Sequence, residues 1–215
     1  ITAHRFKAAV AAWLKASQDI TATPPPRPKP LLKELDRLRS LLIDIVKEAL
    51  TSQDPAWNIE LELVSMLQTL GGSEEALDIF LERRARAAEA SSEGVPPPPS
   101  GSGEDKHFEY WRALIAVTLD AIPSTLQKLS DAFSHQCTSR GLAWALEQVE
   151  RAVHLFVAKV LNSGHSPPLV RRCLVEMLSR CESLEKQGLQ LMPVLRRYLV
   201  PEMIEYITYE FDAAT

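Results

Sequence analysis

The side chains best suited to metal or nucleophilic chemistry are five histidines and three cysteines. His135 and Cys137 lie close enough in sequence to bind one ion together, but a zinc site needs two further ligands at suitable spacing. Cys173 and Cys181 lie far from this pair, on another predicted helix, where eight residues separate them on one face. We interpret these two cysteines as small core residues. The sequence therefore predicts no metal and no cofactor.

One pair and one cluster have residue types that could serve in acid–base chemistry. Glu150 and His154 are four residues apart, like a base and its orienting carboxylate, but no nucleophile or oxyanion donors are recognisable nearby, and such pairs usually stabilise a helix surface. Glu74, Glu75 and Asp78 fit the first turn of a helix, where the dipole favours acids. No metalloprotease, serine-hydrolase or phosphate-loop motif is present. We predict that the chain is not an enzyme and has no catalytic residues.

The locally basic spot of the sequence is the cluster Arg83, Arg84 and Arg86. Such a cluster can bind an acidic partner or an anionic lipid headgroup. It can also be a solvated helix face on which the arginine stems cover apolar surface. Both interpretations stay open, and these three arginines are the candidate binding residues.

Composition narrows the class of protein. A net charge of −4 gives no overall attraction for nucleic acid or anionic lipid. Hydrophobic residues make up 46% of the chain but aromatic residues only 7%, so the core must be aliphatic. No apolar run approaches the ~20 residues that cross a bilayer. The odd number of widely spread cysteines fits a reducing compartment, so we expect a cytoplasmic protein.

Apolar stripes with alternating spacings of four and three residues recur along the chain, as in helices that pack against other helices. The first stripe contains Leu31, Leu35, Leu38, Leu42, Ile45 and Ala49. The second contains Trp111, Leu114, Ile115, Thr118, Ile122, Leu126, Leu129 and Phe133. The third contains Leu142, Leu146, Val149, Val153, Phe156 and Val160. The fourth contains Val170, Leu174, Met177, Cys181, Leu184 and Gly188.

Prolines and glycines mark where these helices should begin, bend and end. Gly71-Gly72 should stop one helix, and Ser166-Pro167 should open another. Pro123 should kink the helix that contains it. Pro201 should start a last amphipathic helix, whose predicted apolar face contains Met203, Ile204, Ile207 and Phe211.

The predicted fold is all-α, an elongated rod of antiparallel helical bundles without a β-sheet, because no segment shows the alternation of a half-buried strand. Stretches rich in proline, or in glycine and serine, divide the chain. The predicted parts are an N-terminal helix (1–20), a Pro-rich spacer (21–30), a first helical bundle segment (31–90), a flexible linker (91–106) and a second bundle segment (107–215).

Three stretches together resemble a known family. Residues 63–89 read LVSMLQTLGGSEEALDIFLERRARAAE, with an EEAL run, a Leu-Phe-Leu element and a following arginine. Residues 141–145 read GLAWA, and residues 171–191 read RRCLVEMLSRCESLEKQGLQL. The order and spacing of these stretches resemble the C-terminal helical region of exocyst component eight, the exocyst's "eighty-four" subunit, over about residues 59–207. Ala85 departs from the family's usual serine, and the Pro-rich linker at 95–99 replaces a compact connector.

This resemblance implies a rod of stacked helical bundles in a complex that tethers secretory vesicles at the plasma membrane. It implies a non-catalytic scaffold, cytoplasmic and peripheral at secretion sites. The implied partners are other exocyst subunits, with a small GTPase bound through regions outside these residues, no nucleic acid and at most peripheral membrane contact. The alternative is an all-helical regulator of a small GTPase, either an exchange factor or an activating protein, with Arg84 or Arg86 as an arginine finger.

Overall fold

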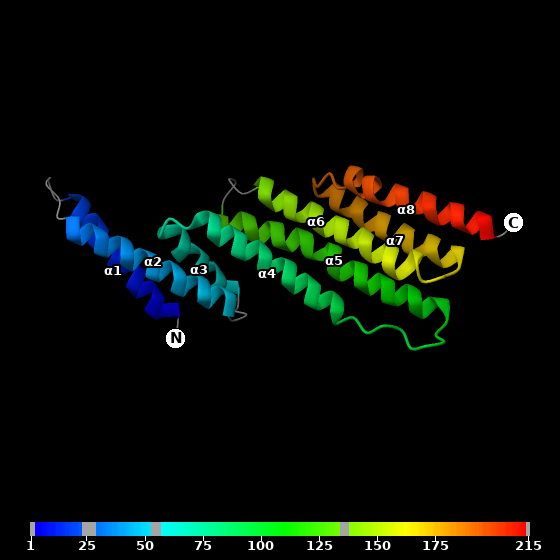
Figure 1. Ribbon diagram of the computed structural model, residues 1–215, viewed down its shortest axis with the longest axis horizontal. Helices are drawn as coiled ribbons and strands as arrows, with labels where there is room; N and C mark the ends of the chain where they lie inside the picture. Colours follow the sequence, from blue (N-terminus) through cyan, green and yellow to red (C-terminus); the bar gives the residue numbers. More distant parts are fainter. Residues whose placement is uncertain (1–2, 23–28, 53–56, 134–137, 214–215) are drawn as a thin grey trace. The chain divides into compact units, whose positions relative to one another are not determined.

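The computed structural model describes residues 3–22, 29–52, 57–133 and 138–213, and all regular elements within these ranges are helices (Figure 1). The predicted all-α class is therefore confirmed. Two compact units divide the chain, residues 1–83 and residues 84–215.

The first unit contains three helices and the beginning of a fourth. They are α1 (Ala3–Ala22), α2 (Lys29–Ser52), α3 (Trp57–Thr69) and the first part of α4 (Ser73–Glu93). Helices α1, α2 and α3 pack against one another in pairs. The core of this unit includes Val46, Leu50, Leu63, Val64, Leu67, Leu70, Leu77 and Phe80.

The turn between α3 and α4 lies at Gly71-Gly72, as predicted. Gly71 has φ = +83°, a left-handed conformation that glycine adopts without a Cβ penalty. The Gly72 N–H donates to the Leu67 carbonyl at 2.8 Å, so a free carbonyl at the end of α3 gains a partner. Arg39 of α2 donates through Nε to the Leu70 carbonyl at 2.6 Å. The turn therefore ties three helices together.

Both ends of the predicted spacer at 21–30 lie in helices. Helix α1 continues to Ala22, and α2 begins at Lys29 with Pro30 in its first turn. Proline is tolerated there because the first backbone N–H groups of a helix have no partner within the helix. Residues 23–28 lie outside the described residues.

The second unit contains the end of α4, then α5 (Glu104–Phe133), α6 (Thr138–Phe156), a short π-helical turn η2 (Val157–Leu161), α7 (Pro167–Lys186) and α8 (Met192–Ala213). Helix α5 packs against both α6 and α7 (Figure 1). Helix α8 packs mainly against α6. The core includes Trp111, Ile115, Leu119, Ile122, Val149, Phe156, Leu169, Met177, Leu191 and Leu195. The predicted linker at 91–106 is helical at both ends, since α4 ends at Glu93 and α5 begins at Glu104.

The predicted stripe of α5 faces the core. Every member is buried except Leu126, which is half-buried. The helix runs without interruption through Pro123, so packing of this stripe outweighs the loss of one backbone hydrogen bond. In α6, the predicted stripe is buried from Val149 onwards. Leu142 is 40% exposed, so the prediction that it packs against another helix was wrong.

Polar contacts also join α5 to α7. The Trp111 indole N–H donates to the Cys173 carbonyl at 3.1 Å. Arg180 of α7 binds Asp120 of α5 and Glu176 of its own helix, each at 2.8 Å. Helix α7 begins as predicted, because Ser166 accepts a hydrogen bond from the Leu169 N–H at 3.4 Å and Pro167 is the first helical residue.

Candidate functional site

The three candidate arginines do not share one open face. Arg83 is half-buried in the first unit, where it donates to the Leu50 carbonyl and lies 3.7 Å from the Glu60 carboxylate (Nε to Oε1). Glu60 is only 2% exposed, so Arg83 neutralises a buried charge. Arg84 is half-buried and Arg86 is exposed. Contact of this cluster with an acidic partner or lipid stays a prediction, and Arg83 already has a structural role.

The cysteines of α7 lie in the core. Burial raises the pKa of the Cys173 thiol to about 11, against a smaller lowering by Arg172. Burial, with a contribution from Glu185, raises the pKa of Cys181 to about 11 as well. Both side chains are therefore protonated thiols at neutral pH, which are poor metal ligands and poor nucleophiles.

Within the described ranges, no group of three histidine, cysteine, aspartate or glutamate side chains is arranged to hold a metal ion. The predicted pair His135 and Cys137 lies outside those ranges. Glu150 and His154 are close on the exposed surface of α6, with 4.0 Å between Oε1 and Nε2. Glu74 and Glu75 lie in the first turn of α4 as predicted, and Glu75 pairs with Lys47 at 3.4 Å. Both the Glu150–His154 pair and the Glu75–Lys47 pair therefore have the geometry of ion pairs on helix surfaces.

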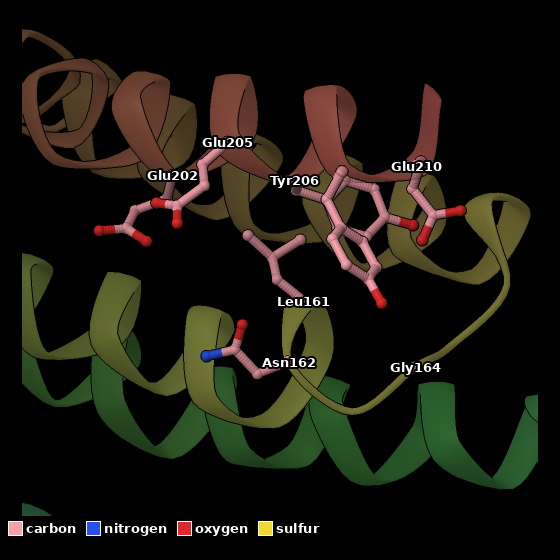
Figure 2. A pocket seen from close by; sticks show the side chains of 8 residues that line it. Leu161, Asn162, Gly164, Glu202, Glu205, Tyr206 and Glu210 are labelled. Atoms are coloured by element: carbon pink, nitrogen blue, oxygen red, sulfur yellow. The ribbon is translucent and has the colours of Figure 1, made fainter. Parts of the chain in front are cut away.

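A cavity of about 450 Å³ opens between α8 and the end of η2 with the turn that follows it (Figure 2). Its floor is the turn that contains Leu161, Asn162 and Gly164, and its other residues are Glu202, Glu205, Tyr206, Tyr209 and Glu210 of α8. Figure 2 shows Tyr206 directed from α8 towards this turn. The cavity is therefore lined on the α8 side by carboxylates and phenols rather than by apolar side chains.

Sequence reasoning missed this polar face of α8. Burial raises the pKa of the Tyr206 phenol, and the neighbouring Glu210 carboxylate raises it further. The signal that could have identified the face is the spacing of four residues between Glu202, Tyr206 and Glu210, which places them on one side of a helix.

Helix α8 corrects two predictions. It is one helix from Met192 to Ala213 with Pro201 inside it, so Pro201 does not start a separate element. The predicted apolar face points outwards rather than into the core. We define the α8 stripe as the four side chains that repeat with 4-3-4 spacing along this face. They are Val200 at 49% exposed, Ile204 at 60%, Ile207 at 47% and Phe211 at 72%.

Helix α2 also carries apolar side chains on its surface. Its buried residues are Val46 and Leu50, whereas the predicted stripe is half-buried or exposed. The side of α2 that α1 and α3 cover is rotated away from that stripe. We define the α2 leucine face by its exposed members, which are Leu31 at 52%, Leu38 at 39% and Leu41 at 50%.

None of the described helices combines the length and apolarity needed to cross a membrane. The search of curated proteins found no match for this chain. A family described as "Exocyst component 84 C-terminal" matches residues 1–192. That range contains the first unit, α5, α6 and α7, and it extends the predicted resemblance from residue 59 back to residue 1. The chain therefore belongs to the exocyst component 84 family, whose members are subunits of a vesicle-tethering complex.

Proposed function

We propose that the chain is a non-catalytic scaffold of the exocyst, which acts in exocytosis by packing its exposed helix faces against helices of other exocyst subunits. The observation that carries the proposal is the α2 leucine face. Leu31, Leu38 and Leu41 are separated by seven and three residues, so they lie on one side of α2. A second helix that covered this side would remove their apolar surface from water, which stabilises a complex.

The membership in the exocyst component 84 family supports this function, because the α2 leucine face lies within the matched residues. Clustered exposed leucines are typical of interaction surfaces. The chain's own helices α1 and α3 pack on other parts of α2. The α2 leucine face is therefore available to a helix from another subunit.

The experiment mixes the full chain with each of the other purified exocyst subunits and measures recovery of complexes. We expect the parent chain to bind at least one subunit. The double substitution Leu31→Asp with Leu38→Asp should weaken that binding at least about tenfold, because it places two carboxylates in an apolar contact.

Ser40→Asp is the matched control. It adds a carboxylate at an exposed position on the opposite side of the same helix and should bind like the parent. Circular dichroism and the melting temperature should confirm that each variant is folded. Failure of the parent to bind any subunit, or equal binding by the double variant and the control, would contradict the proposal.

Further parts of the function belong to the same proposal. As an exocyst subunit the chain would work in the cytoplasm, peripheral to the plasma membrane at secretion sites. Contact of the cluster Arg83, Arg84 and Arg86 with an acidic partner or lipid is part of this proposal, although Arg83 also pairs with Glu60. Regulation of a small GTPase remains the alternative, and unchanged nucleotide exchange and hydrolysis across a GTPase panel would eliminate it.

A further inference from the structure

Four consecutive prolines, Pro96 to Pro99, lie between the end of α4 and the start of α5. The pyrrolidine ring fixes the φ angle of each proline at about −65°, and a residue that precedes a proline is kept out of the helical region. Pro96, Pro97 and Pro98 meet both conditions, so their backbone is restricted to the polyproline II conformation. In agreement, residues 96–99 belong to no helix or turn and lie in the trace that joins α4 to α5 (Figure 1).

The three edges of this segment have different surroundings. A polyproline II helix has three residues per turn and rises ~3.1 Å per residue, so Pro96 and Pro99 share one edge and are about 9 Å apart. Both are exposed. Pro97 and Pro98 occupy the other two edges and line a cavity of about 330 Å³ together with Trp111, and Pro98 is half-buried there. The chain therefore covers part of two edges and leaves the Pro96–Pro99 edge in solvent.

The backbone of the segment keeps its acceptors available. The Pro99 carbonyl accepts a hydrogen bond from the Ser102 N–H at 3.1 Å, which closes a turn directly after the prolines. Within the described part of the chain, no backbone N–H donates to the carbonyls of Pro96, Pro97 and Pro98. Exposed proline rings three residues apart fit between the aromatic side chains of a groove. Free carbonyls beside these rings can accept hydrogen bonds from tryptophan N–H or tyrosine O–H groups of that groove.

We propose that the Pro96–Pro99 edge is a binding site for a polyproline-recognising domain, a folded domain whose ligand groove is lined by aromatic side chains. The segment already has the conformation that such a groove binds, so association costs little ordering entropy. This partner differs in chemistry from a helix that would cover the α2 leucine face, and the inference therefore goes beyond the proposed scaffold function. The alternative, in which the prolines only connect α4 to α5, is an outcome of the test below.

The test measures binding of the full chain to a panel of purified SH3, WW and EVH1 domains by isothermal titration calorimetry. We expect at least one of these domains to bind the parent chain. Pro96→Ala with Pro99→Ala should weaken that binding at least about tenfold, because it removes both rings of the exposed edge and loosens the backbone. Both positions are exposed and outside the helices, so the double variant should melt like the parent.

Pro25→Ala with Pro28→Ala is the matched control. These two prolines have the same spacing of three residues in the other proline-rich stretch of the sequence, residues 21–30. The control removes the same number of rings at the same spacing and should bind like the parent.

A peptide comparison removes any dependence on folding. A synthetic peptide of residues 93–102 should compete with the parent chain for the bound domain. The same peptide with Pro96→Ala and Pro99→Ala should compete at least about tenfold less well. Because the peptides need no tertiary structure, this result does not depend on the stability of the variants.

The inference is overturned if no domain of the panel binds the parent chain, or if the Pro96 and Pro99 double variant binds like the parent. It is also overturned if the Pro25 and Pro28 control loses binding as strongly as the double variant, or if the two peptides compete equally. Subunit binding through the α2 leucine face is measured separately. If that binding persists while the domain panel fails, the scaffold function stands and only the polyproline inference is lost.

Discussion

At the scale of single residues, the second unit contains a pair of histidines whose rings lie close together at a tilt of 58°. The rings of His107 and His165 lie 4.7 Å apart between centroids, beside Lys159 in a cavity of about 330 Å³. Burial lowers the pKa of His165, and the charge of His107 lowers it further. A backbone hydrogen bond with Lys159 and the charge of Glu104 oppose that lowering without cancelling it. His165 is therefore held in its neutral form.

This pair predicts a pH dependence of stability. Because the pKa of His165 is lower in the folded chain than the ordinary 6.5, the unfolded chain binds more protons as pH falls. The contribution of His165 to the free energy of unfolding should therefore be largest above pH 6.5 and should decrease as the pH falls below 6.5. It should level off once the pH lies below the lowered pKa of the folded chain.

Urea unfolding of the parent, His165→Gln and the exposed control His154→Gln, at about pH 7.5 and about pH 5.5, measures this effect. His165→Gln should lose less stability between the two pH values than the parent, and His154→Gln should behave like the parent. An unchanged pH dependence in His165→Gln would rule out this role of His165.

At the scale of elements, the turn between α3 and α4 depends on one backbone conformation. Gly71 is left-handed, and a Cβ on it would lie 2.5 Å from Nη2 of Arg39. Arg39 is the residue that binds the Leu70 carbonyl. Any side chain at this position therefore strains the backbone and disturbs the contact with α2.

Gly71→Ala should lower the free energy of unfolding by about 1–3 kcal/mol. Gly103→Ala is its control, because a Cβ there would meet no atom within 4 Å and no left-handed conformation is required. Chemical denaturation of both variants provides the comparison. Equal stability of the two variants would show that the turn can adopt another conformation.

At the scale of the whole molecule, the division into two compact units predicts that a defect in one unit stays there. Arg83→Met leaves the Glu60 carboxylate buried in the first unit without its arginine. We expect a loss of about 3 kcal/mol, because removing one partner of a buried ion pair is costly. Hydrogen exchange should accelerate in α2 and α3 and stay unchanged in α5, α6 and α7.

Arg86→Met, at an exposed position three residues further along α4, should leave exchange unchanged in both units. Equal acceleration throughout the chain in Arg83→Met would instead show one cooperative unit. The predicted division into a spacer, a linker and two bundle segments stays a prediction.

The all-helical class and the inner faces of α5 and α7 could be read from the sequence alone. Spacings of three and four residues follow from helix geometry, and Trp111, Ile122 and Met177 lie in the core as their spacing predicts. Gly71 and Ser166 were also identifiable, because turn and cap chemistry acts within a few residues of chain.

Only the tertiary structure decided which stripes are covered. Periodicity shows that Leu38 and Ile204 each belong to an apolar face, but it does not show whether another helix packs there, since that depends on residues far along the chain. Packing turned Glu202 and Tyr206 towards the cavity beside η2 and left Ile204 outside. It also gave Arg83 a buried carboxylate to neutralise. Local spacing determines the face of a helix, and long-range contacts determine what that face meets.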